Sequence, residues 1–132
     1  MNFSPEEAIE YAKNKKLKEW VHGFLTTIGK NEELAEIMER SGTLEAPKKI
    51  SLNKLIRICG PEEGMKYKEE QKDWDKRVDK MTEEIKSDWE TPPLIVWRHE
   101  NGKLTVADGS HRVEALRKAG IKSYWAIIWN KV

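Results

Sequence analysis

Two short apolar runs separated by an Asn-Gly dipeptide constrain this chain more than any other feature. Leu94–Arg98 is a nearly all-apolar run, and Leu104–Ala107 is a second one. Asn101-Gly102 lies between them, and this dipeptide favours the tight turns of two-stranded antiparallel hairpins. The pattern therefore predicts a β-hairpin over residues 94–107.

The segment after the hairpin predicts a helix and a further strand. Asp108-Gly109-Ser110 turns the chain, and Val113, Leu116 and Ala119 have the spacing of one buried helix face. Gly120 ends this helix, and Tyr124–Trp129 forms a last apolar strand. We expect the strands at 104–107 and 124–129 to run parallel, joined by a right-handed crossover. With the antiparallel hairpin, this gives a small mixed sheet with helices on it, an α/β (α+β) fold.

The first 46 residues predict a helical section packed on this core. Ser4-Pro5-Glu6-Glu7 is a strong helix start, and we expect that helix to run to about Lys18. An apolar stripe from Leu17 to Ile28 predicts a second helix, and Asn31 caps a third. Pro47 marks the boundary, so the predicted domains are residues 1–46 and 47–132.

The middle of the chain is highly charged but still patterned. Lys48–Ser51 is expected as a strand and Leu52–Cys59 as a short helix. Within residues 62–88 the apolar side chains Trp74, Val78, Met81 and Ile85 recur at helical spacing. We expect one amphipathic helix there, with lysines interleaved with acids on a solvated face.

Charge and cysteine content narrow the class of protein. Net charge is +1, but residues 91–132 carry seven Lys and Arg against three acids. This distribution favours a small anionic ligand near the C-terminal third and makes DNA a weaker partner. The single Cys59 is typical of a reducing cytoplasm. No apolar run approaches the roughly 20 residues needed to span a bilayer, so we expect no membrane partner.

The stretch from Asp108 to Arg112 carries the expected chemistry. Free backbone N–H groups and the dipole at a helix start attract anions, and Gly109 lets a ligand approach the main chain. Ser110 and His111 add hydrogen-bonding groups, and Arg112 offers a planar fork for phosphate. The competing interpretation is an ordinary capped helix with His111 and Arg112 at its surface. Because basic residues at a helix N-terminus oppose the dipole, we favour an anion site.

These residues resemble the ParB/sulfiredoxin superfamily, which includes ParB-like nuclease domains and free serine kinases. The resemblance covers residues 48–129 and rests on Ile50–Leu55, Pro93–Val96, Ala107–Arg112, Glu114–Leu116 and Ala119-Gly120. The sulfiredoxin branch carries a catalytic cysteine where this chain has Ser110, which argues against sulfiredoxin chemistry. The free serine kinase branch carries Asp-Gly-His-His-Arg, which differs only at Ser110.

The resemblance implies a nucleotide phosphate site and its residues. Gly109, Ser110, His111 and Arg112 match the phosphate-binding loop, and the implied cofactor is Mg²⁺ with ATP, CTP or another nucleotide. Catalytic candidates are Asp108 and His111, together with Glu62 and Glu63 after the first strand. Asp108 is the candidate metal ligand, near the Mg²⁺ that would bridge the phosphates. No His/Cys/Asp/Glu set shows zinc spacing.

The implied functions stay open between three classes. The first is an ATPase or small-molecule kinase with a phosphate acceptor, the second is a nucleic-acid-binding or nuclease module, and the third is a non-catalytic regulatory domain. A homodimer is compatible with each. Trp97, Trp125 and Trp129 are expected in the core, with the alternative that one flanks the pocket and stacks on a base.

Overall fold

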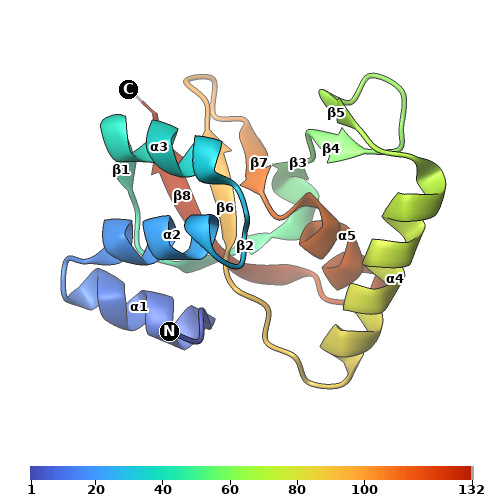
Figure 1. The fold of residues 1–132 in the computed structure, drawn as a ribbon, viewed down its shortest axis with the longest axis horizontal. Coiled ribbons are helices and arrows are strands. Elements are labelled where there is room, and N and C mark those ends of the chain that lie inside the picture. Colours follow the sequence, from blue (N-terminus) through green and yellow to red (C-terminus); the bar gives the residue numbers. More distant parts are fainter. Residues whose placement is uncertain (132) are drawn as a thin grey trace.

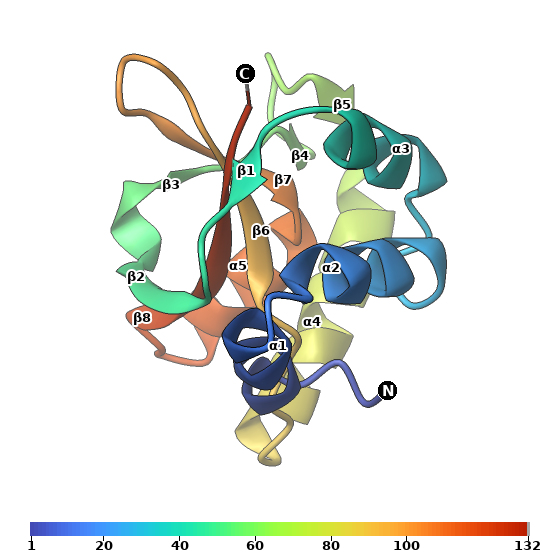
Figure 2. The same cartoon turned by 90° about the vertical axis from the view of Figure 1, so that its left-hand side faces the viewer.

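A computed structural model describes residues 1–131 and has three layers. A mixed sheet lies in the middle, with helices α1 to α3 against one face and helices α4 and α5 against the other (Figures 1 and 2). The predicted α/β fold with a small mixed sheet is therefore confirmed. No helix among residues 1–131 has the length and apolar character needed to cross a membrane.

The helices and strands have the following bounds. The α-helices are α1 (Pro5–Lys13), α2 (Leu17–Thr26), α3 (Glu32–Arg40), α4 (Gln71–Lys86) and α5 (Ser110–Lys118), with a short 3₁₀ helix at Leu52–Lys54. The strands are β1 (Thr43–Leu44), β2 (Lys48–Ser51), β3 (Leu55–Ile56), β4 (Cys59–Gly60), β5 (Tyr67–Lys68), β6 (Leu94–Arg98), β7 (Leu104–Asp108) and β8 (Ser123–Asn130).

The sheet has the order β1-β8-β6-β7-β3, and β2 also pairs with β8. The predicted hairpin is present as the antiparallel pair β6 and β7. Parallel pairing joins β6 to β8 and β3 to β7, whereas β1 and β2 run antiparallel to β8. Strands β4 and β5 form a separate two-stranded sheet beside the main one.

The predicted parallel orientation of β7 and β8 is wrong. Strand β8 lies beside β6, which is antiparallel to β7, and so β8 runs opposite to β7. Strands β6 and β8 carry apolar side chains on both faces, so both must be covered by other layers. Adjacent positions in the centre of the sheet provide this cover. The far edge of β7 pairs with the short β3 instead.

The two central strands divide their side chains between two hydrophobic cores. On one face, Val96 and Ile128 pack with α4 and α5. On the other face, Ile95, Ile127 and Trp129 pack with α1 to α3. The helical section of residues 1–46 thus shares a core with the sheet.

Capping residues mark the starts of α1 and α3 as predicted, whereas the end of α1 and the helix predicted at Leu52–Cys59 need correction. The Ser4 side chain accepts a hydrogen bond from the Glu7 amide, and Asn31 accepts one from Leu34, so both predicted caps are present. Helix α1 ends at Lys13 and not near Lys18, because the chain reverses through Lys15 at a φ of 59°. The predicted helix at Leu52–Cys59 is wrong: a three-residue 3₁₀ turn leads into β3, whose backbone pairs with β7.

Glu45 ties the first part of the chain to the sheet. Its carboxylate accepts a 2.9 Å hydrogen bond from Asn130, a 3.1 Å bond from Lys48 and a further bond from Arg98. The hydrogen bond from Asn130, aided by Lys48 and Arg98, lowers the pKa of Glu45 from its ordinary 4.5 to about 2, against the opposing effect of burial.

Replacing Glu45 with Gln should reduce the free energy of unfolding by about 1 kcal/mol at neutral pH, since an amide cannot replace the charged acceptor. The folded-state pKa is depressed, so the stabilisation is complete above pH 4.5 and is lost as the pH falls through about 2. Thermal unfolding of both proteins over this pH range measures the difference. Glu83→Gln, at an exposed position of α4, is the control. If the loss of unfolding free energy in Glu45→Gln stays the same at pH 2 as at neutral pH, the depressed pKa of Glu45 is not the source of the stabilisation.

Candidate anion-binding site

The predicted motif forms a tight corner between β7 and α5. Strand β7 ends at Asp108 and α5 begins at Ser110, with Gly109 between them at a φ of 116°. A Cβ at position 109 would lie 2.9 Å from Leu94 Cδ2 and 3.0 Å from Arg112 Nη2. Gly109 is therefore required both by its backbone angle and by the close approach of two side chains.

Arg112 is buried beneath this corner. Its Nη2 donates to Asp108 Oδ2 at 3.0 Å, while Nη1 donates to the carbonyls of Pro92 and Pro93. The guanidinium also lies 5.4 Å from the ring of Phe24 in α2, and the residue is only 6% exposed. Burial lowers the pKa of Arg112, and Asp108 opposes this change. The fork expected to hold a ligand phosphate is thus engaged by acceptors inside the protein.

His111, in the first turn of α5, also has an internal partner. Its Nε2 lies 2.6 Å from Glu69 Oε2, and its ring lies 4.6 Å from the ring of Trp74. Burial lowers the pKa of His111, and the hydrogen bond to Glu69 opposes this. The conflict between basic side chains and the helix dipole is consequently relieved by Asp108 and Glu69, so it does not by itself call for a bound anion.

The structure separates the glutamates predicted from the sequence from the motif. Glu62 forms an ion pair with Arg57 at 2.6 Å, and Glu63 is paired with Lys68 and 92% exposed. Neither lines the cavity at the corner. The carboxylate that contacts the motif is Glu69, which the sequence analysis missed. It precedes α4 in a run of charges, and no periodicity marked it as different from its solvated neighbours.

The corner opens into a cavity of about 510 Å³, a volume in the range of small-molecule sites. The walls of the cavity are formed by residues of α3, of the β4–β5 segment together with Arg77 of α4, and of the β7–α5 corner. The lining residues include Asp108, Gly109, Ser110 and His111. Three of the four predicted phosphate-loop residues therefore face the cavity, and Arg112 lies behind them.

Cationic and aromatic side chains line the same cavity. Lys66, Arg77 and Lys131 contribute positive charge, against the acidic Glu33 and the already paired Asp108. Within residues 1–131, neither Lys66 nor Lys131 forms an ion pair. The aromatic rings are those of Tyr67, Trp97 and Trp129. Trp125 is partly buried elsewhere on β8, with Lys49 over its ring.

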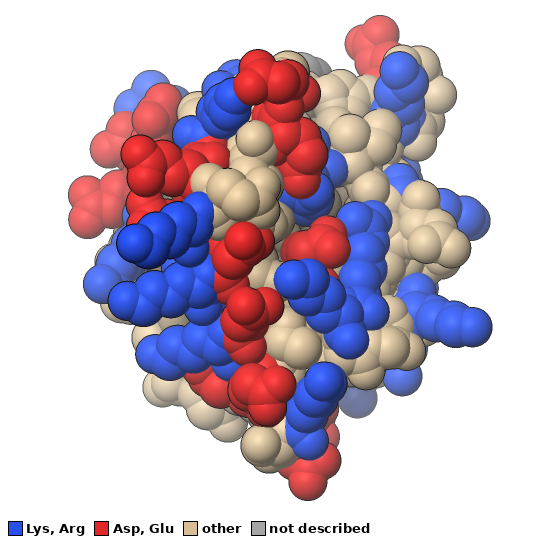
Figure 3. Space-filling view, turned by 90° about the vertical axis from the view of Figure 1, so that its right-hand side faces the viewer, with Lys and Arg blue, Asp and Glu red and all other residues tan. Residues whose placement is uncertain are grey.

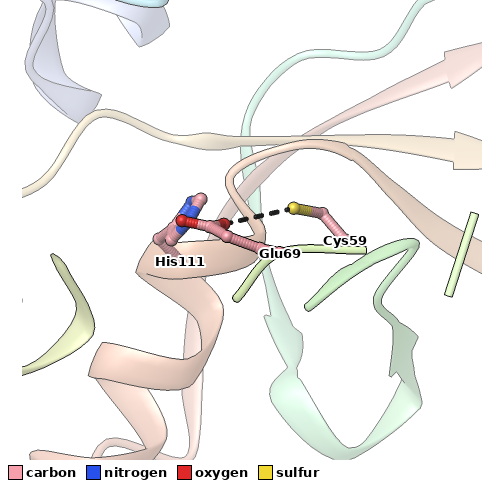
Figure 4. A group of neighbouring side chains, drawn as sticks. All are labelled: Cys59, Glu69 and His111. Atoms are coloured by element: carbon pink, nitrogen blue, oxygen red, sulfur yellow. Dashed lines mark hydrogen bonds and ion pairs between the residues drawn. The ribbon is translucent and has the colours of Figure 1, made fainter. Parts of the chain in front are cut away.

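Side chains of metal-ligating types meet at one side of the cavity. The ligand atoms of Cys59, Glu69 and His111 all lie within 4.8 Å of one another (Figure 4). Burial, together with the nearby Glu69 carboxylate, raises the pKa of the Cys59 thiol. Asp108, the metal ligand expected from the motif, is instead paired with Arg112.

Comparison with known proteins adds one structural likeness. No family model matches the chain, and neither does any curated protein. A solved structure of the C-terminally truncated chromosome-partitioning protein ParB from Caulobacter crescentus, complexed with CTP-γ-S, is similar with a TM-score of 0.45 and 17% sequence identity. The similarity covers 66% of this chain and 44% of that protein, less than half of its length. The resemblance of the motif to the ParB/sulfiredoxin superfamily stays a prediction.

Replacing Gly109 with Ala should destabilise the protein by about 3 kcal/mol, combining backbone strain with a clash against the fully buried Leu94. Gly64→Ala is the matched control, because Gly64 also has a positive φ but no atom lies near its missing Cβ. Gly64→Ala should lower the free energy of unfolding by about 1 kcal/mol, from backbone strain alone. Chemical denaturation measures both values, and equal losses would refute the close approach at Gly109.

Replacing Arg112 with Gln should lower the free energy of unfolding by about 3 kcal/mol, because Asp108 and two carbonyls lose a buried charged donor. Arg40→Gln is the control, because Arg40 also pairs with a carboxylate four residues away, that of Glu36, but is 79% exposed. This change should alter the free energy of unfolding by less than about 0.5 kcal/mol. Urea unfolding of both variants distinguishes a buried support from a surface charge. A loss at Arg112 as small as that at Arg40 would count against the buried role.

Proposed function

We propose that this protein binds a nucleotide, ATP or CTP, in the cavity at the β7–α5 corner. One observation carries the proposal: a cavity of about 510 Å³ combines the start of a helix, three cationic side chains and three aromatic rings. A nucleotide has the matching parts, since its phosphates are anionic and its base offers an aromatic face. Hydrophobic ligand cavities with a few convergent polar groups commonly bind ligands of this size.

The phosphates are assigned to the corner. Ser110 and His111 are in the first turn of α5, where backbone N–H groups lack partners within the helix and the dipole favours negative charge. No side chain caps this helix start at Gly109. Lys66, Arg77 and Lys131 supply charge from the other walls. In this assignment Arg112 is a positioning residue that fixes the corner, and Gly109, Ser110 and His111 contact the ligand.

The base is assigned to the aromatic wall. Tyr67, which is 57% exposed, is the ring assigned to stack on the base. Trp97, which stacks on His99, and Trp129, which is buried in the core, complete the wall near the ends of β6 and β8. Stacking on such rings is tolerant of base identity, because every base has a flat aromatic face. A wall of this kind would accept the base of either ATP or CTP.

Magnesium fits this site as part of the nucleotide. Mg²⁺ prefers oxygen ligands and is commonly held by nucleotide phosphates together with one or two carboxylates. Asp108 is paired with Arg112, which leaves Glu33 as the carboxylate of the lining that has no cationic partner within residues 1–131. When bound, the ion would neutralise phosphate charge, and the chain itself would position the phosphates.

Turnover by this site, as an ATPase or a kinase with a small-molecule acceptor, would need a proton acceptor. Asp108 is an unsuitable candidate because its carboxylate is engaged by Arg112. His111 is the better one: burial lowers its pKa, which keeps the imidazole neutral near pH 7, and Glu69 orients the ring. Catalysis beyond this proton transfer would come from positioning and charge stabilisation.

Nucleic acid is the weaker candidate for the anionic ligand. On the face presented by α4, Lys and Arg alternate with Asp and Glu and form no continuous basic surface (Figure 3). Nucleic-acid binding draws its affinity from many phosphate contacts with clustered positive charge. A cavity with three cations suits a single nucleotide better than a polymer.

Calorimetry with ATP, ADP and CTP, with and without Mg²⁺, tests the proposal. The double variant Lys66→Gln/Arg77→Gln should weaken nucleotide binding about tenfold or more, because it removes two cations from the cavity wall. The matched control Arg40→Gln/Lys72→Gln removes two exposed cations that do not line the cavity, and it should bind as the unmodified protein does.

Two outcomes would contradict the proposal. The first is the absence of heat with every nucleotide, and the second is an equal effect of the two double variants. Phosphate release measured alongside binding separates the enzyme from a non-catalytic nucleotide-binding domain, which would bind without turnover.

A further inference from the structure

Three residues that are distant in the sequence meet beside the cavity. Cys59 belongs to β4, Glu69 follows β5, and His111 lies in the first turn of α5. Figure 4 shows the three side chains pointing toward one another from these separate segments. Their ligand atoms Sγ, a carboxylate oxygen and a ring nitrogen all lie within 4.8 Å of one another.

The hydrogen bonds of this group converge on a single oxygen. Cys59 Sγ donates to Glu69 Oε2 at 3.7 Å, and His111 Nε2 lies 2.6 Å from the same atom. On metal binding the Cys59 thiol would release its proton and the His111 ring would carry its proton on Nδ1, because ligands of these types bind as thiolate and neutral imidazole. The hydrogen-bonded group thus brings three side chains of metal-ligating types to one point.

The distances require only a small adjustment. Zinc lies about 2.0 to 2.3 Å from nitrogen, oxygen and sulfur ligands, which places tetrahedral ligand atoms roughly 3.3 to 3.8 Å apart. The 3.7 Å separation of Cys59 Sγ and Glu69 Oε2 already matches this range. The 2.6 Å separation between Glu69 Oε2 and His111 Nε2 would have to widen by about 1 Å, and the ligand atoms of Cys59 and His111 lie within 4.8 Å of each other.

Neighbouring residues hold the ligands in place. The Trp74 ring lies 4.6 Å from the His111 ring, and Arg77 approaches the second carboxylate oxygen of Glu69 at 3.6 Å. Such contacts around a metal site orient the ligands and tune their affinity. Cys59 and His111 both line the cavity, so a fourth coordination position would face it.

We propose that Cys59, Glu69 and His111 form a binding site for a thiophilic divalent cation, with zinc as the matching metal. A thiolate, an imidazole and a carboxylate favour zinc over magnesium or calcium, which prefer oxygen ligands. Three protein ligands with one open position are the arrangement of catalytic zinc sites, where the ion binds water or a substrate oxygen. This site goes beyond the proposed nucleotide function and does not depend on it.

A bound metal changes the role of His111. The ion takes the position of the proton between Nε2 and Glu69, so metal binding and the observed hydrogen bond exclude each other. In the metal-loaded protein His111 is a ligand and is unavailable as a proton acceptor. The β4–β5 segment and the start of α5 would then be linked directly through the ion.

Cobalt titration of the reduced, metal-free protein tests the site. Co²⁺ substitutes for zinc and gives a thiolate-to-cobalt charge-transfer absorption, which Cys59 alone can produce because the chain has a single cysteine. The expected result is this absorption in the unmodified protein, its loss on adding Zn²⁺, and its absence in Cys59→Ser. Glu69→Gln and His111→Asn should each weaken zinc binding by about tenfold or more.

Glu63→Gln is the matched control, because it removes a 92% exposed carboxylate between β4 and β5 and should leave zinc affinity unchanged. Circular dichroism of each metal-free variant verifies that it is folded. Failure to see the charge-transfer absorption, or a zinc affinity unaffected by Cys59→Ser, Glu69→Gln or His111→Asn, would overturn the proposal. These readouts use no nucleotide, so their failure is distinct from a failure of nucleotide binding.

Discussion

The buried guanidinium of Arg112 is the interaction on which the candidate site depends. It joins the end of β7 through Asp108, the segment before β6 through the carbonyls of Pro92 and Pro93, and α2 through the Phe24 ring. A buried cation is stable only if its donors are matched by acceptors, and here the acceptors come from two segments that are distant in the sequence, residues 92–93 and Asp108. Arg112 therefore holds three separate parts of the fold together at the corner.

Gly109 and Arg112 are mutually dependent. Without a Cβ at position 109, the guanidinium can fold back under the loop and reach Asp108, and the loop can keep its positive φ. Much of the Asp-Gly-Ser-His-Arg order therefore has a structural explanation. Asp108, Gly109 and Arg112 form the corner, whereas Ser110 and His111 face the cavity. A motif of this kind can preserve a fold while the ligand differs between proteins.

Much of the fold could be predicted from local sequence signals. The Asn101-Gly102 hairpin, the Ser4 and Asn31 caps and the amphipathic pattern of Trp74, Val78 and Ile85 each act within a few residues, and each is present. Strand order was missed because it depends on which apolar strands fill the centre of the sheet, a property of the whole layer. The short β3 escaped notice because two residues carry no periodicity.

The site was predicted less completely than the fold, for a related reason. Its loop was visible because Asp108 to Arg112 are contiguous, but Glu69 and Cys59 join it only through folding. Nothing in the spacing of positions 59, 69 and 111 indicates a shared site. The burial of Arg112 was likewise invisible, since an exposed and a buried arginine look the same in a helix's first turn.

The division of the chain near Pro47 does not correspond to a division of the hydrophobic core. Ile95, Ile127 and Trp129 in the central strands are covered by helices that precede this point in the chain. Removing those helices would expose the apolar side chains of this sheet face to solvent, and exposed apolar patches promote aggregation. The N-terminal helices are therefore part of the same folding unit as the motif, although the motif lies entirely within residues 47–132.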